Sequence, residues 1–248
     1  MCTVTFIARK NGYFLGMNRD EKLTRPSGLP PERKNLNGRG VISPSEPGGG
    51  TWIALNDHGV TLSLINWYSI AARVGGKAVS RGIIINSIST VSSADFADAG
   101  LALLPLDRIN PFRLIGVFPM TGEIVEWRWN LTQLARKTHR WQARQWASSG
   151  FNELTAQRVR GGTFRQAQKQ ETAGTLGWLR RVHRSHLPRP GPCSICMHRA
   201  DAATVSYTEI SVSSLEATMR YHPGAPCRNL ESSCVQGLDF SRRIRPPF

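Results

Sequence analysis

The sequence begins MCTVTF, so a cysteine directly follows the initiator methionine. The Cys2 side chain is small enough for Met1 to be removed during synthesis, which would leave a thiol and a free α-amine on one residue. The thiolate is the reactive form, and a free thiol with a pKa of ~8.5 is mostly protonated at neutral pH. An α-amine that titrates near ~7.7–8 can accept that proton. Cys2 is therefore a candidate nucleophile that carries its own base.

The segments that surround Cys2 have the pattern of a β-hairpin. Residues 2–8 and 13–19 alternate between apolar and polar, and Asn11-Gly12 between them is a strong hairpin signal. With Asn11-Gly12 as the loop, opposite residues have numbers that sum to 23, and Cys2 faces Glu21. We therefore predict that Cys2 lies beside the polar stretch that ends the second strand.

That stretch contains groups that could assist a thiol. Alternation puts Asn18 and Asp20 on one face of the strand, and Arg19 and Glu21 on the other. Asp20 could orient the ammonium and Arg19 could favour the thiolate, or the two could form a structural ion pair that closes the hairpin. Asn56, at the end of TWIALN, could donate to the oxyanion formed on a carbonyl, or it could simply begin a turn.

The remaining pattern predicts antiparallel sheets covered by helices, which is an α+β layered fold. In the first half we expect a long loop over 24–50 and a hairpin over 51–67 that turns at 57–59. A buried strand or a helix should follow over 80–89, and then a helix capped by Ser92 or Ser93 with Phe96 on its apolar face. Two strands are expected over 112–119 and 122–129. In the second half we expect a helix over 131–146, one or two helices over 163–186, and a hairpin of 194–199 with 203–213.

The composition is that of an ordinary globular protein with a strong positive charge. The net charge is +15, and the segment 128–200 is the most basic, with Glu153 and Glu171 as its only acids. This segment indicates either an anionic partner or a solvated basic face. The five cysteines are an odd number, and the first residues do not form a signal peptide. We expect a cytoplasmic protein with no transmembrane segment.

Three longer stretches resemble a known family. MCTVTF, GMNRDEKLTRP and GGTWIALNDHGVTLSLINW look like the NRDE family, also called the Transport and Golgi organisation 2 family, and SICMHRADAATVSYTEI and YHPGAPC are similar to its C-terminal half. The resemblance spans residues 1–227. We therefore expect one domain over 1–227, followed by a poorly ordered Pro- and Arg-rich tail over 228–248.

The resemblance implies a four-layer αββα sandwich of the N-terminal nucleophile hydrolase type. That family looks distantly like the choloylglycine hydrolase and penicillin V acylase group, whose members cleave linear amides with a cysteine exposed by removal of methionine. In this comparison Cys2 matches the nucleophile, Asp20 the carboxylate that holds its amine, and Asn56 an oxyanion-hole residue. Met17 stands where those enzymes have an arginine, which favours a protein that kept the fold without the chemistry.

Other residues complete the set of candidates. A second asparagine and a late arginine of the acylases are matched only loosely, by Asn152, Arg158 and Arg160. We expect Asn18, Arg158 and Arg160 to contribute to ligand binding.

Two patterns suggest a metal. Cys193-x-x-Cys196 with His198, Cys227 and Cys234 suggests zinc, but the second cysteine pair is too widely spaced. His183 and His186 could bind a metal or haem, although a packed helix is the commoner explanation. We therefore expect neither a metal nor a cofactor.

Two functions remain. The first is an N-terminal cysteine hydrolase or acyltransferase acting on a linear amide or thioester, with a small anionic or acyl molecule as its substrate. The alternative is a carrier or binding protein for a lipid, acyl-CoA or haem, involved in transport or secretory organisation. Nucleic acid is not an expected partner, because no recognised nucleic-acid motif accompanies the basic segment.

Overall fold

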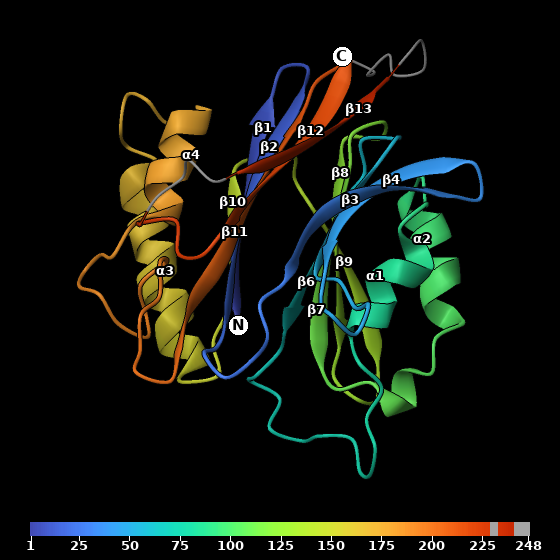
Figure 1. Ribbon diagram of the computed structural model, residues 1–248, viewed down its shortest axis with the longest axis horizontal. Helices are drawn as coiled ribbons and strands as arrows, with labels where there is room; N and C mark the ends of the chain where they lie inside the picture. Colours follow the sequence, from blue (N-terminus) through green and yellow to red (C-terminus); the bar gives the residue numbers. More distant parts are fainter. Residues whose placement is uncertain (229–232, 241–248) are drawn as a thin grey trace.

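Two antiparallel sheets lie face to face, with helices on the outer side of each (Figure 1). The computed structural model describes residues 1–228 and 233–240. The layers run from α3 and α4, through a six-stranded sheet and a seven-stranded sheet, to α1 and α2. The predicted four-layer αββα sandwich is confirmed.

The six-stranded sheet carries the N-terminus and has the order β10-β1-β2-β11-β12-β13. Its strands are β1 (Cys2–Arg9), β2 (Gly12–Lys22), β10 (Arg144–Ser148), β11 (Ala202–Val212), β12 (Glu216–Pro223) and β13 (Cys234–Asp239). The sheet continues beyond the expected domain end at 227, because β13 pairs with β12 over 234–239. Residues 229–232 and 241–248 lie outside the described residues.

The hairpin of β1 and β2 has a register two residues away from the prediction. Cys2 pairs with Arg19 and Arg9 with Gly12, so the turn is Lys10-Asn11. Gly12 has a φ of +132°, and a Cβ there would lie 2.0 Å from the Val212 carbonyl oxygen. The close approach of β11 thus requires glycine in the strand itself. A shift of two residues leaves every side chain on its predicted face.

The seven-stranded sheet has the order β3-β4-β5-β6-β7-β8-β9. Its strands are β3 (Leu29–Leu36), β4 (Arg39–Ser45), β5 (Ile53–Asn56), β6 (Thr61–Asn66), β7 (Phe112–Phe118), β8 (Glu123–Trp129) and β9 (Leu134–His139). The predicted hairpin of β5 and β6 and the predicted strands β7 and β8 are confirmed.

The expected long loop over 24–50 is wrong, because β3 and β4 form a hairpin there. Its turn is Asn37-Gly38, where both residues have positive φ (53° and 79°), as the favoured two-residue hairpin turn requires. The prolines 30 and 31 that suggested a loop lie in β3, which is an edge strand and tolerates missing donors.

The expected helix over 131–146 is also wrong, because the segment forms β9 and β10. Asn130 accepts hydrogen bonds from the backbone N–H groups of Thr132 and Gln133 at 2.9 and 2.8 Å. This is the bonding of a helix cap, but here it closes the turn between β8 and β9. The arginines that suggested a helical stripe lie on two strands and the connection between them.

The helices cover the outer faces of the sheets. Their bounds are α1 (Gly82–Ile88), α2 (Ala94–Ala102), the 3₁₀ turn η1 (Leu106–Arg108), α3 (Glu153–Ala167) and α4 (Leu176–His183). The Ser93 hydroxyl caps α2, as predicted, but Phe96 is 65% exposed and Ala97 and Leu101 face the sheet instead. No helix among the described residues is both long and apolar enough to cross a membrane.

Apolar clusters of buried side chains hold the layers together. The largest lies between the sheets and includes Cys2, Val4, Met17 and Trp52. A second joins α1 and α2 to the seven-stranded sheet, and a third joins α3 and α4 to the other sheet. The segment 194–199 makes only an isolated bridge to β11, from His198 to Ala203, so the late hairpin is formed by β11 and β12 instead.

Candidate active site between the sheets

The first strand places Cys2 at an edge of the space between the sheets. Its backbone is paired on both sides, with Arg19 in β2 and with Ser148 in β10. The Cys2 N–H donates to the Ser148 hydroxyl at 3.1 Å. The Cys2 side chain belongs to the cluster between the sheets and is 6% exposed. Two neighbouring strands therefore fix the position of both the thiol and the nitrogen.

Met1 continues the same strand by one residue. The Met1 ammonium donates to the Asp20 carbonyl at 2.9 Å, and the Asp20 N–H donates to the Met1 carbonyl at 2.8 Å. The residue is only 9% exposed, and its side chain packs against Met197 and Ala202. As long as Met1 is present, its peptide bond blocks the nitrogen of Cys2, and its backbone forms hydrogen bonds with the N–H and C=O groups of Asp20.

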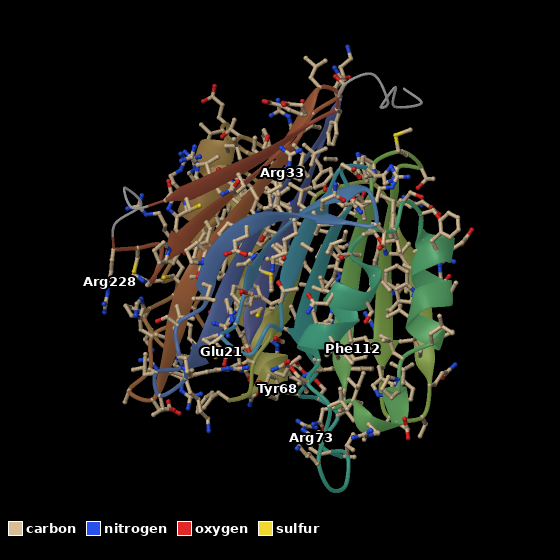
Figure 2. All side chains as sticks on the ribbon, turned by 45° about the vertical axis from the view of Figure 1, so that its right-hand side comes forward. Glu21, Arg33, Tyr68, Arg73, Phe112 and Arg228 are labelled. Carbon is tan, nitrogen blue, oxygen red and sulfur yellow. The ribbon has the colours of Figure 1, made fainter. Side chains whose placement is uncertain are left out.

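Two cavities meet at Met1. One, of about 250 Å³, is lined by Cys2 and Arg19 among others, and the second, of about 690 Å³, extends towards Tyr68 and Arg199. Both are lined by Met1, Glu21, Arg25, Asn66 and Arg81. Figure 2 shows Glu21 and Tyr68 close together at this end of the molecule. The side chain of Met1 therefore lies where the two spaces adjoin.

Several charged side chains line the smaller cavity. The Arg19 guanidinium stacks over the Trp52 ring, 4.2 Å from its centroid, and pairs with Glu46 at 2.6 Å. Arg25 pairs with Glu46 at 2.6 Å and with Glu21 at 3.2 Å. As the alternation predicted, Arg19 lies on the same face of β2 as the thiol, and Arg19 instead of Met17 supplies a guanidinium beside Cys2.

Arg81 differs from Arg19 and Arg25 in its surroundings. Among the described residues no carboxylate pairs with Arg81, whose guanidinium donates to the Pro111 carbonyl at 2.9 Å. Burial lowers the pKa of Arg81 below its ordinary value, although an arginine stays charged at neutral pH. Arg81 is thus the cation of both cavities that is best able to bind an incoming anion.

The electrostatics favour an ammonium and a neutral thiol while Met1 is present. Burial raises the pKa of the Cys2 thiol, against the opposing effects of the Met1 ammonium and Arg19. Burial lowers the pKa of the Met1 ammonium, but the attraction of Cys2, Tyr68 and the acids Glu21 and Asp20 raises it overall to about 10. An amine at this end of β1 is therefore held in its charged form.

The Asp20 carboxylate lies on the opposite face of β2, towards α3. It pairs with Arg160 at 3.1 Å, both side chains being fully buried, and accepts a hydrogen bond from the Thr204 hydroxyl at 2.7 Å. Arg160 also donates to the Thr3 hydroxyl at 2.8 Å. The ion pair of Asp20 and Arg160 ties α3 to the two strands that carry the cysteine.

Asn18 makes a second connection on that face. Its amide donates to the carbonyls of His183 and Ile195 at 2.9 Å, and its oxygen lies 3.0 Å from His183 Nδ1, so Nδ1 carries the proton and donates. Arg158, by contrast, is exposed on α3, and Asn152 caps that helix. Asn18 and Arg160 therefore position the strands, and Arg158 lies on the surface.

The buried imidazole predicts a loss of stability in acid. Burial, together with the charge of Arg160, lowers the pKa of His183 to about 3, whereas an unfolded histidine titrates near ~6.5. Below pH 6.5 the unfolded chain binds a proton that the folded chain excludes, so stability falls as the pH falls from 6.5 towards 3. We expect this one group to remove roughly 2–3 kcal/mol between pH 7 and 4.5.

Denaturant unfolding at several pH values measures this effect. His183→Gln keeps an amide donor for Asn18 and removes the titrating group, so its stability should change less with pH than that of the parent. All other titrating groups are the same in the parent and in the variant, so they affect both stability curves alike. Parallel curves for the two proteins between pH 7 and 4.5 would exclude the titration of His183 as the cause.

Asn56 makes its hydrogen bonds at the turn that follows β5. Its amide donates to the carbonyls of Ser89 and Val91 at 2.9 and 2.8 Å, and its oxygen accepts from the N–H groups of His58 and Val60. Asn56 thus closes the turn between β5 and β6 and holds the segment that links α1 to α2. It does not line the cavity at Cys2.

Several residues at the cavity have no counterpart among the sequence predictions. Ser148 reaches Cys2 through strand pairing, and Asn66, Arg81 and Asn110 reach the cavity from the ends of other elements. Short-range patterns contain no information on these contacts. A separate group of histidines and cysteines that could hold a metal lies around 186–198 and 227, outside this cavity.

Known proteins resemble this chain in sequence and in fold. A family model for Transport and Golgi organisation 2 matches residues 1–164. Penicillin V acylase from Agrobacterium tumefaciens has a similar structure, with a TM-score of 0.58 and 10% identity over 98% of this chain and 87% of that chain.

A variant of conjugated bile acid hydrolase from Clostridium perfringens gives a TM-score of 0.50 with 9% identity, over 99% and 98% of the two chains. No curated protein matches the sequence. At these identities the two solved structures establish the fold alone, which is that of the N-terminal nucleophile hydrolases.

Proposed function

The chain belongs to the Transport and Golgi organisation 2 family, and we propose that it is an N-terminal cysteine hydrolase or acyltransferase, acting on a linear amide or thioester once Met1 has been removed. One observation carries the proposal: Cys2 lines a cavity in which Met1 is the residue that occupies its nitrogen. Removal of Met1 would free the α-amine and join the two cavities at the thiol.

The proposed reaction begins with a proton transfer within Cys2. The thiol gives its proton to the α-amine, and the acidic surroundings that raise the pKa of an ammonium at this end of β1 stabilise the product. Arg19 stabilises the thiolate, as its effect on the pKa of Cys2 indicates. Ser148, which lies 3.1 Å from the nitrogen, orients the amine. An ammonium next to a thiolate is the active form.

The chemical step then forms and breaks one bond at the substrate carbonyl. Cys2 Sγ attacks the carbonyl carbon, and the electron pair of the double bond moves to the oxygen. The ammonium then gives its proton to the leaving nitrogen or sulfur as that bond breaks, which leaves an acyl group on Cys2. Water releases the acid in a hydrolase, whereas a second nucleophile accepts the acyl group in a transferase.

The oxyanion needs donors at the cavity. The Asp20 N–H is one candidate, because the Met1 carbonyl that accepts from it at 2.8 Å leaves with Met1. The side-chain amides of Asn66 and Asn110, which line the cavity, are others. These groups take the role that sequence comparison gave to Asn56.

The charges of the cavity favour an acyl substrate that carries an anionic group. Arg81 lines both cavities without a carboxylate partner among the described residues, so it can pair with a carboxylate or phosphate. Arg19 and Arg25 are already neutralised by Glu46 and Glu21. A chain that kept Met1 would bind such a molecule without turning it over, which is the function of a carrier.

The first test is the intact mass of the purified protein, followed by labelling with a limiting amount of iodoacetamide at neutral pH. We expect Met1 to be absent and Cys2 to be labelled before Cys193 and Cys234, which are partly exposed and serve as internal controls. The reason is that the free amine and Arg19 favour the thiolate. If Met1 is retained, or Cys2 reacts no faster than the controls, the hydrolase proposal fails and the carrier remains.

A further inference from the structure

Four metal-ligating side chains from three distant segments meet on the flank of the first sheet. His186 follows α4, Cys196 and His198 belong to the irregular segment before β11, and Cys227 follows β12. One ligand atom from each lies within 4.8 Å of the others. Figure 2 labels Arg228, the residue after Cys227, on this flank of the molecule.

Two distances within the group match the sulfur–nitrogen edge of a tetrahedral zinc site. Zinc bonds of ~2.3 Å to sulfur and ~2.0–2.1 Å to nitrogen give a sulfur–nitrogen edge of ~3.5 Å. His198 Nε2 lies 3.3 Å from Cys227 Sγ and 3.6 Å from Cys196 Sγ. The rings of His186 and His198 meet edge to face, with centroids 5.0 Å apart. All four ligand atoms lie within 4.8 Å of one another, close enough to bind a single ion.

The bonding of His186 gives an independent reason to expect a ligand. Its Nε2 is buried, and no hydrogen-bond partner for it occurs among the described residues. A buried nitrogen without a hydrogen-bond partner destabilises the fold. Coordination of an ion would remove this cost.

We propose that His186, Cys196, His198 and Cys227 form a tetrahedral zinc site. Two thiolates and two neutral imidazoles are a set typical of structural Zn²⁺, and the set contains no oxygen ligand of the kind that Ca²⁺ and Mg²⁺ prefer. When the ion binds, each thiol releases a proton to solvent, so the two thiolates balance the charge of the ion. All four positions are filled by protein, which indicates a structural site and not a catalytic one.

The site would stabilise one wall of the candidate active site. Between two of its ligands lies Met197, which packs against Met1 and whose N–H donates to the Thr204 hydroxyl at 2.8 Å. Thr204 in turn donates to Asp20 at 2.7 Å. The ion would thus join the segment 186–198 to the end of β12, next to the residues that carry Cys2.

The spacing of the cysteines along the chain did not predict a metal site. Neighbours in the sequence pair Cys193 with Cys196, and Cys227 with Cys234. The cluster in the structure contains one cysteine from each of these pairs, and it contains His186 but not His183. Only the fold brings the three segments together, so ligand spacing in the sequence cannot reveal the site.

The test is the metal content of the full chain, purified without added metal and measured by mass spectrometry of its elements. We expect one zinc ion per chain in the parent, and loss of most of it in Cys196→Ser and in Cys227→Ser. Cys193→Ser and Cys234→Ser are matched controls, because both cysteines lie outside the group, and both variants should keep the zinc. Cys227→His restores four ligands and should keep it as well.

The parent itself provides a second measurement, which does not depend on whether a variant folds. Titration of its thiols with a mercurial reagent, followed with a chromogenic zinc chelator, should release one zinc ion as two thiols react. A parent without zinc, or with another metal at one ion per chain, would overturn the proposal. So would a disulfide between Cys196 and Cys227 in the protein as purified, or zinc that persists when both cysteines are replaced.

Discussion

Replacement of Cys2 by alanine should lower turnover roughly 10⁴-fold or more, because it removes the only nucleophile of the proposed reaction. Alanine is small, so removal of Met1 and the position of the α-amine are retained. The lost sulfur packs in the cluster between the sheets, and its absence should cost only about 1 kcal/mol of stability. Turnover is measured on a panel of anionic acyl amides and thioesters, and stability by thermal unfolding.

Cys193→Ala is the matched control, because this partly exposed cysteine lies outside the cavity and should leave turnover unchanged. Cys2→Ser tests the thiol specifically, since it keeps a hydroxyl, the amine and the processing of Met1. Full turnover by the alanine variant would exclude covalent catalysis by Cys2. Loss of turnover together with a large loss of stability would instead assign Cys2 a structural role.

Arg160→Met should destabilise the protein by about 3–5 kcal/mol, because it leaves the fully buried Asp20 carboxylate without its cation. For a chain of this length, that loss lowers Tm by roughly 10 °C. The side chain also donates to Thr3, so its removal loosens α3 from β1 as well. Thermal unfolding and denaturant titration both measure the effect.

Arg158→Met is the control for this prediction. It makes the same substitution two residues away on α3, at an exposed position, and should change stability by less than about 0.5 kcal/mol. The double variant Asp20→Asn with Arg160→Met removes both charges, so it should be more stable than Arg160→Met alone. If Arg160→Met unfolds like the parent, the buried ion pair does not hold α3 to the strands.

Local patterns in the sequence predicted much of the fold. The alternation over 2–19 and the turn at 57–59 gave both central hairpins, and Ser93 marked the start of α2. These signals succeed because turns and caps depend on a few neighbouring residues. The resemblance to a family then supplied the layer order, which short-range signals do not contain.

The failures have physical causes as well. Asn130 makes the same backbone hydrogen bonds in a hairpin turn as it would at a helix start, so the capping signal was ambiguous. Proline suggested a loop over 24–50, but β3 is an edge strand, where a missing N–H costs little. In both cases the neighbour in the sheet, which the sequence does not show, decides the structure.

The candidate site was predicted only in part. Cys2 and Arg19 do line one cavity, because the hairpin alone brings them together. Asn56 closes a turn instead, and Arg81 and Ser148 reach the site from elements that are remote in the chain. Ser148 is placed by the pairing of β10 with β1, and Arg81 lines the cavity from the start of α1.

The burial of Met1 sets an order of events during biosynthesis. An aminopeptidase binds an extended, accessible N-terminus. Met1, by contrast, is 9% exposed and is hydrogen-bonded into the sheet through Asp20. In the proposed enzyme, Met1 therefore has to be removed before the chain folds. A chain that folds with Met1 in place would keep the nitrogen of Cys2 blocked.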